Sequence, residues 1–266
     1  MSRVIRVKTS STAELVARLR AAGCVFAEDE AAILLDAARD AAALESLVSR
    51  REAGEPLETI VGWVAFAGLR LAVAPRVFVP RQRSVRIARA AARIAAGLDR
   101  PIVVEACCGA APIGAVVAAR APGARILAFD IDPAAVAVAR TNLPAAEVLV
   151  GSALAVLPAS VRGRVDLIAA VPPYVPDGER HLMPHDTFDH EPTAALLGGA
   201  DGLDIARALI ADASAWLAPG GRILLELHRS QVPIAAGFAR QHGLTPLRRA
   251  VSADGQTALL DARRPA

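Results

Sequence analysis

The sequence predicts an α/β protein in which a parallel sheet is covered by helices on both faces and is preceded by a small helical domain. Strands apolar on both faces and separated by helical stretches are typical of such a sheet. Five short apolar runs after residue 100 alternate with alanine-rich amphipathic stretches: Ile102–Ala106, Ile126–Phe129, Val148–Val150, Leu167–Val171 and Ile223–Leu227. Before residue 50, apolar residues recur at helical spacing instead.

The N-terminal part is predicted to consist of helices and a bridge over residues 1–75. Leu15 and Leu19 mark the first helix, and Leu44, Leu47 and Val48 mark a later one. A short β-like run closes at Pro80, and the spacing of apolar residues predicts a helix over about 83–96. We assign residues 76–266 to the second domain, which contains the sheet.

Composition narrows the class of protein. Of the 266 residues, 54% are hydrophobic, which is enough to bury a sheet on both sides. The sequence contains no run of about 18 apolar residues, the length needed to span a membrane, and the N-terminus lacks the apolar core of a secretory signal. We therefore expect a cytoplasmic enzyme.

Charges and cysteines argue against two other classes of site. The net charge is only +3, the arginines are scattered, and aromatic residues make up 3%, so no direct nucleic-acid binding is expected. Cys24, Cys107 and Cys108 are odd in number and two are adjacent, which suits neither a disulfide framework nor a zinc site.

Small and acidic residues follow the first three strands of the sheet. Parallel sheets bind ligands at the carboxyl ends of their strands, near the point where strand order reverses. Asp130 can accept both hydroxyls of a ribose, while Asp132 suits the cap of a helix starting at Pro133. The predicted cofactor-binding residues are Glu105, Cys107, Gly109, Asp130, Ile131, Ser152 and Ala153.

The residues after the fourth strand favour a methyl donor over a nicotinamide cofactor. Val171-Pro172-Pro173-Tyr174 ends the strand with two prolines, which cannot continue a ladder, and then presents an aromatic ring. We expect the carbonyls of this rigid rim to face the cleft and orient a nitrogen that is methylated. An ordinary proline turn is the alternative. Val171, Pro172, Pro173 and Tyr174 are the predicted catalytic residues.

Several motifs in order resemble one family. They are Arg51 to Gly62 (REAGEPLETIVG), Val77 to Arg81 (VFVPR), Val171 to Tyr174, Glu191-Pro192, Gly198 to Leu203 (GGADGL) and Leu217 to Gly221, followed by Glu226 and Gln231. Together they resemble the protein glutamine N5-methyltransferases that modify peptide-chain release factors, the PrmC/HemK group. The resemblance implies a Rossmann-like class I methyltransferase sheet, S-adenosylmethionine as cofactor, and a helical N-terminal domain that helps to recognise a protein substrate.

The chain departs from that family at several positions. Val171 replaces an asparagine that hydrogen-bonds the acceptor amide in the family, and Gln82 and Arg83 replace a proline and a glutamate. Cys107 and Ala111 stand at positions that are usually glycine. The acceptor is therefore either a release-factor glutamine or a small molecule methylated on nitrogen or oxygen. A non-catalytic module that binds S-adenosylmethionine is a third possibility.

The long loop after Pro176 contains His181, His185 and His190 beside acidic residues. Their spacing is irregular, so no metal is expected, and we expect the loop to cover the acceptor cleft. A histidine there could act as a base. The predicted substrate-binding residues are Pro80, Arg81, His185, His190 and Glu191.

Overall fold

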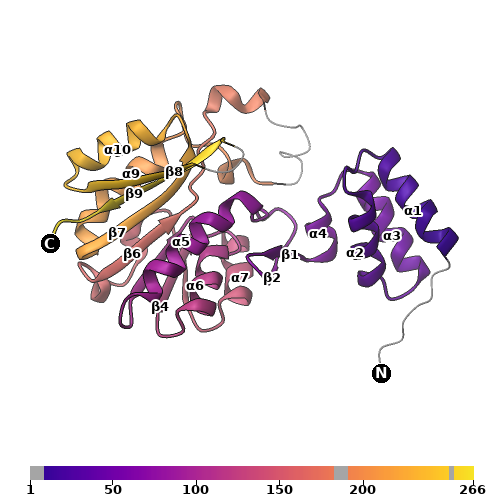
Figure 1. The fold of residues 1–266 in the computed structure, drawn as a ribbon, viewed down its shortest axis with the longest axis horizontal. Helices are drawn as coiled ribbons and strands as arrows, with labels where there is room; N and C mark the ends of the chain where they lie inside the picture. Colours follow the sequence, from indigo (N-terminus) through magenta and orange to yellow (C-terminus); the bar gives the residue numbers. More distant parts are fainter. Residues whose placement is uncertain (1–8, 183–190, 252–254) are drawn as a thin grey trace.

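The computed structural model describes residues 9–182, 191–251 and 255–266, and its centre is a seven-stranded sheet (Figure 1). In spatial order the strands are β5 (Glu147–Val150), β4 (Arg125–Asp130), β3 (Ile102–Ala106), β6 (Val165–Ala170), β7 (Leu217–His228), β9 (Thr257–Arg263) and β8 (Thr245–Val251). The first five run parallel, whereas β9 is antiparallel to both of its neighbours. From β3 the chain continues outward to β4 and β5, and it then returns to the other side of β3 to form β6 and β7. The strand order therefore reverses between β3 and β6.

Helices cover both faces of the sheet, as the sequence predicts. One face packs against α5 (Val85–Ala96), α6 (Pro112–Arg120) and α7 (Pro133–Asn142), and the other against α9 (Asp204–Trp216) and α10 (Val232–Gln241). Successive residues of β3 alternate between the two cores: Val103 belongs to the first and Val104 to the second. The alternation explains why these strands are apolar throughout.

The five predicted strands are confirmed, with small changes at their ends. The last one is longer than its apolar run and begins at Leu217. Asp132 caps α7, as expected, because its side chain accepts a hydrogen bond from Ala134 N at 2.8 Å. The β-like run before Pro80 is mostly wrong, since the strand there ends at Ala72 and the chain continues without regular structure.

The N-terminal helices form a core of their own. They are α1 (Thr9–Ala21), α2 (Ala27–Ala37), α3 (Ala41–Glu52) and α4 (Leu57–Val61), and they bury residues such as Leu19, Leu34 and Ile60. The hairpin of β1 (Trp63–Phe66) and β2 (Leu69–Ala72) instead buries Phe66 in a core of the sheet. Core membership thus changes around Gly62, and a domain boundary at residue 75 stays a prediction.

Asn142 at the end of α7 fixes the hairpin to the sheet domain. Its side chain accepts from Ala72 N at 2.8 Å and donates to Ala72 O at 3.0 Å and to Ala110 O at 2.8 Å. One side chain therefore connects the end of β2 to the loop that follows β3. Among the described residues, no helix is both long enough and apolar enough to cross a membrane.

Candidate active site

A cavity of about 480 Å³ lies where the strand order reverses. Its walls come from the carboxyl ends of β3, β4, β5 and β6, together with two segments outside the sheet, 77–84 and 192–197. This is the position at which open parallel sheets bind ligands. The strand-end residues predicted from the sequence, apart from Ala153, thus line one cavity.

The loop after β3 has an unusual backbone. Cys107, Gly109 and Ala111 have φ values of +50°, +52° and +55°, in the left-handed region that favours glycine. A side chain at such a position costs about 1–2 kcal/mol, so Cys107 and Ala111 add strain to this loop. Burial raises the pKa of the Cys107 thiol to about 12, so it stays protonated and is not a nucleophile.

Glu105 at the end of β3 lies under this loop and is almost fully buried. Its carboxyl group accepts hydrogen bonds from Ile113 N at 3.0 Å and Gly114 N at 2.6 Å, at the start of α6. The residue lines the cavity, but it also holds the helix N-terminus in place. Burial in this apolar setting raises the pKa of Glu105 to about 8.

The free energy of unfolding is expected to depend on the ionisation of Glu105. Its folded-state pKa lies above its ordinary value, so the folded protein holds a proton that the unfolded chain has released. Stability from this group is present at low pH and is lost as the pH rises from the ordinary value of 4.5 to about 8. Thermal midpoints of the cofactor-free protein, measured over this range, should therefore fall, and Glu105→Gln should flatten the dependence. Parallel curves for the two proteins would contradict this assignment.

Asp130 ends β4 and reaches the same cavity. Its carboxylate accepts from Gly109 N at 2.8 Å and from Asp132 N at 3.0 Å, so it connects the β3 loop to the turn before α7. Burial raises the pKa of this half-buried group. Ile131 is 61% exposed and lines the cavity with Ser152, whereas Ala153 is not among the lining residues.

The rim after β6 lines the other end of the cavity. Val171 is half-buried, Pro172 is buried, and Pro173 and Tyr174 follow them along the wall. Of the proline carbonyls expected to face the cleft, the one at Pro173 lies against another loop instead. The Pro173 carbonyl packs against Gly198, where an added Cβ would come within 2.4 Å of it, and the Tyr174 carbonyl accepts a hydrogen bond. The physical reason is that the rim lies directly against the Gly198–Leu203 loop.

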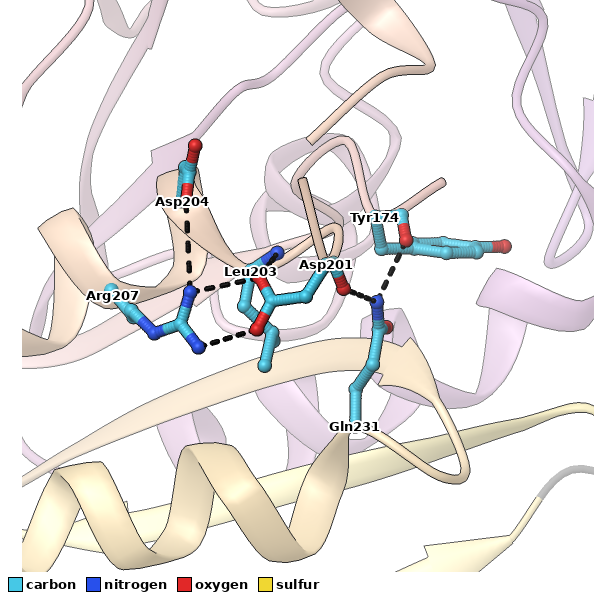
Figure 2. Close-up of polar contacts among 6 residues, drawn as sticks. All are labelled: Tyr174, Asp201, Leu203, Asp204, Arg207 and Gln231. Carbon is cyan, nitrogen blue, oxygen red and sulfur yellow. Dashed lines mark hydrogen bonds and ion pairs between the residues drawn. The ribbon is translucent and has the colours of Figure 1, made fainter. Parts of the chain in front are cut away.

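Gln231 holds the rim in this position (Figure 2). Its Nε2 donates to Tyr174 O at 2.8 Å and to Asp201 O at 2.9 Å, and its Oε1 accepts from His228 N at 3.0 Å. The Asp201 side chain is paired in turn with Arg207. A single amide thus joins the rim, the glycine-rich loop and the end of β7.

The segment before α5 supplies the wall between the two ends of the cavity. Pro80 and Arg81 line it, as expected for substrate-binding residues, and the Arg81 guanidinium lies 4.8 Å above the centre of the Phe78 ring. Glu191 has a different place from the one expected. It is buried, accepts from Val79 N at 3.1 Å and pairs with Arg81, so it positions this segment from behind.

The predicted histidine loop is only partly described. His181 is exposed in the 3-10 segment Asp177–Leu182, while His185 and His190 lie outside the described residues. Across residues 9–182, 191–251 and 255–266, no group of three or more histidine, cysteine or acidic side chains is placed to hold a metal ion. The role of a histidine as base remains a prediction.

Several cavity residues were missed by the sequence analysis. Phe78, Arg83 and Ser84 come from the segment before α5, Ile205 comes from α9, and Pro192 to Leu197 form the wall facing the rim. The last of these segments is placed by backbone pairing, since Val175 N donates to Leu196 O at 3.0 Å and Gly198 N to Val175 O at 2.9 Å. Such pairing between irregular segments has no periodicity that a sequence pattern could reveal.

The cavity suits S-adenosylmethionine by its chemistry. Asp130 and Asp132 place two carboxyl groups at one end, which suits a cationic ligand that carries ribose hydroxyls. Val171, the two prolines and Leu196 make much of the wall at the other end apolar, which favours exclusion of water from a ligand bound there. When bound, the cofactor supplies an electrophilic methyl group on its sulfonium.

Comparisons with known proteins agree with this geometry. A family model described as "Methyltransferase small domain" matches residues 93–197. A 4-amino-L-phenylalanine/4-methylamino-L-phenylalanine methyltransferase of Streptomyces pristinaespiralis is 39% identical over 203 residues, which cover 74% of this chain and 69% of that protein. A release factor glutamine methyltransferase of Cereibacter sphaeroides is 35% identical over 230 residues, which cover 85% of this chain and 81% of that protein.

Solved structures support the fold. A methyltransferase from Pyrococcus furiosus superposes with a TM-score of 0.54 at 16% identity, covering 84% of this chain and 98% of that one. The 16S rRNA N2 G1207 methyltransferase of Thermus thermophilus, solved with S-adenosylmethionine and guanosine, gives 0.53 at 20% identity, covering 76% of this chain and 49% of that one. The chain is therefore an S-adenosylmethionine-dependent methyltransferase with a Rossmann-like class I fold, and it belongs to the family of the release-factor glutamine methyltransferases.

Proposed function

We propose that the protein methylates the amino group of a small aromatic amine rather than the glutamine amide of a release factor. The observation that carries this proposal is the side chain at the rim, where Val171 stands at the end of β6 and lines the cavity. An amide nitrogen has its lone pair delocalised into the carbonyl and needs hydrogen-bonding partners to orient it. Valine offers none, and leaving a buried amide group unpaired costs about 1–3 kcal/mol.

An aromatic amine suits the same wall better. Its lone pair is delocalised into the ring, so the amine is neutral near pH 7 and needs no base to prepare it. The lining residues from 171–175 and 192–197 include one titratable side chain, Tyr174, whose pKa is raised by burial. An alkyl amine would arrive protonated and would require a base that this wall does not provide.

The reaction at such a nitrogen requires little from the protein beyond placement. The nitrogen forms a bond to the methyl carbon as the carbon–sulfur bond breaks, and the methylated nitrogen then releases a proton to solvent. Pro172 and Pro173 hold the rim rigid, Gln231 fixes its backbone, and the apolar wall keeps water away. The relative from Streptomyces pristinaespiralis, whose name specifies an amino-phenylalanine acceptor, supports an acceptor of this class.

A release-factor glutamine is the second candidate. The sequence from Arg51 to Gly62 keeps the family's bridge, and it folds into the end of α3 and into α4 in contact with the N-terminal helices. Release factor glutamine methyltransferases also make up several of the similar proteins. Methylation of a glutamine amide would require another group to form the hydrogen bond that the family's asparagine makes.

Substitution of Val171 by asparagine separates the two candidates. With 4-amino-L-phenylalanine as acceptor, we expect turnover by the wild-type protein and a loss of about tenfold in the variant, because an unpaired amide is placed against the ring. With a bacterial release factor as acceptor, we expect no gain. Methyl incorporation measured by mass spectrometry reports both, and Val171→Ala controls for the change in shape. A rise in release-factor methylation of tenfold or more would refute the proposal.

A further inference from the structure

Of the two arginines that line the cavity, one forms no ion pair within the described part of the chain. Arg81 and Arg83 both line it, from the segment before α5. The Arg81 guanidinium pairs with the buried Glu191 carboxylate and stacks on Phe78, so its charge is satisfied within the protein. Arg83 forms no ion pair with any residue of the described part of the chain. The side chain is exposed at the cavity, so its guanidinium is accessible to a ligand there.

Arg83 is aimed at the acceptor rim. Its Nη2 donates to the hydroxyl oxygen of Tyr174 at 3.0 Å, and this tyrosine directly follows Val171-Pro172-Pro173. The Tyr174 backbone is fixed by Gln231, and its ring points away from that contact (Figure 2). A phenol that accepts from arginine keeps its own proton to donate. Arg83 and Tyr174 thus present several N–H groups and one O–H group at the same end of the cavity.

The carboxyl groups and the arginines that line the cavity come from different segments of the chain. Asp130 and Asp132 come from the end of β4 and the turn before α7, where the cofactor is expected. Arg83 contacts Tyr174 at the end where the acceptor is expected, and the cavity is also lined by apolar residues such as Phe78, Leu196 and Ile205. Guanidinium groups bind carboxylates by short, charge-assisted hydrogen bonds, often two at once. An acceptor that fits this end carries an apolar ring and an anionic group.

We propose that Arg83, together with the Tyr174 hydroxyl, binds the carboxylate of the acceptor, which is an aromatic amine carrying a carboxylic acid. This inference rests on the proposed function and makes Arg83 a specificity-determining residue. The carboxylate, held at Arg83, directs the opposite end of the molecule, with its amine, toward Val171. The glutamine side chain of a protein has no anionic group to occupy this position.

A pair of acceptors that differ only in charge tests the proposal. They are 4-aminohydrocinnamic acid and its primary carboxamide, each assayed with the wild-type protein and with Arg83→Gln. For the acid, we expect the variant to raise KM by roughly ten- to a hundredfold, since hydrogen bonds to a charged group are lost, with little change in kcat. For the carboxamide, KM should stay within about twofold. Arg83→Lys should keep part of the preference, and Arg89→Gln, an exposed arginine of α5 outside the cavity, is the matched control.

A binding measurement separates this inference from the proposed function. Calorimetric titration of 4-aminohydrocinnamic acid into protein saturated with S-adenosylhomocysteine requires no turnover. Weaker binding to Arg83→Gln than to wild type supports the carboxylate site even if no aromatic amine is methylated, an outcome that would refute the proposed function alone. The carboxamide is titrated in the same way. If the ratio of the affinity for the acid to the affinity for the carboxamide were the same in wild type and in Arg83→Gln, the inference would be overturned, whether or not methylation occurs.

Discussion

Substituting alanine for Gly202 is expected to abolish methyl transfer and to lower the thermal midpoint of unfolding. Gly202 has φ +73°, and a Cβ there would lie 2.1 Å from the Tyr174 carbonyl oxygen and 2.5 Å from Gln231 Nε2. Backbone cannot yield as a flexible side chain can, so the methyl group would push the rim away from the loop. The conformational strain costs about 1–2 kcal/mol and the overpacking a further 1–3 kcal/mol. Calorimetry of the cofactor-free protein measures the loss of stability, and kcat measures the loss of methyl transfer.

A matched glycine distinguishes the clash from the strain. Gly163 has nearly the same backbone angle, φ +71°, but an added Cβ would meet nothing within 4 Å. Gly163→Ala should therefore lose only the strain energy of about 1–2 kcal/mol and keep its turnover once folded. If Gly202→Ala were no less stable and no less active than Gly163→Ala, the contact between rim and loop would not matter for catalysis.

The contacts of Gly202 explain why the motif from Gly198 to Leu203 contains a glycine at this position, which the sequence alone does not show. The motif from Gly198 to Leu203 is one of those that resemble the family, but its physical role depends on residues far away along the chain. Gly198 lies against the Pro173 carbonyl, and Gln231 bonds Tyr174, 57 residues earlier. These contacts depend on how β6, β7 and α10 come together. No local pattern encodes such a meeting.

The sheet itself was predictable because its signals are local. Apolar runs and proline or aspartate at helix starts fix the elements, and Asp132 was correctly assigned to the cap of α7. Parallel strands bring their carboxyl ends to one edge by geometry, so Glu105, Asp130 and Val171 were expected together. The segment from Val77 to Ser84 was located less well. Its place in the cavity wall depends on Glu191, a partner 112 residues from Val79.

Removing the Asp130 side chain is expected to have the second large effect, on binding of the cofactor. Its carboxylate accepts a hydrogen bond from Gly109 N at 2.8 Å, and in the proposed site it would also accept hydrogen bonds from the two ribose hydroxyls. Each hydrogen bond to a charged group contributes about 1.5–3 kcal/mol, so Asp130→Ala should weaken binding of S-adenosylhomocysteine by about a hundredfold or more. Asp130→Asn keeps the shape and one acceptor oxygen, and should show a loss of about tenfold.

Asp132 provides the control, because it lines the same cavity but has a structural partner. Its side chain caps α7 through Ala134 N, so Asp132→Ala should lower stability by about 1 kcal/mol and leave affinity within a few-fold of wild type. Isothermal titration with S-adenosylhomocysteine, paired with thermal midpoints, separates the two residues. If Asp132→Ala lost affinity and Asp130→Ala kept it, the ribose would lie on the turn before α7 rather than at the end of β4.

Because burial raises the pKa of Asp130, its carboxylate is protonated at a higher pH than an exposed aspartate. The affinity of the wild-type protein for S-adenosylhomocysteine should therefore fall on acidification, at a pH at which the affinity of Asp130→Asn is still unchanged.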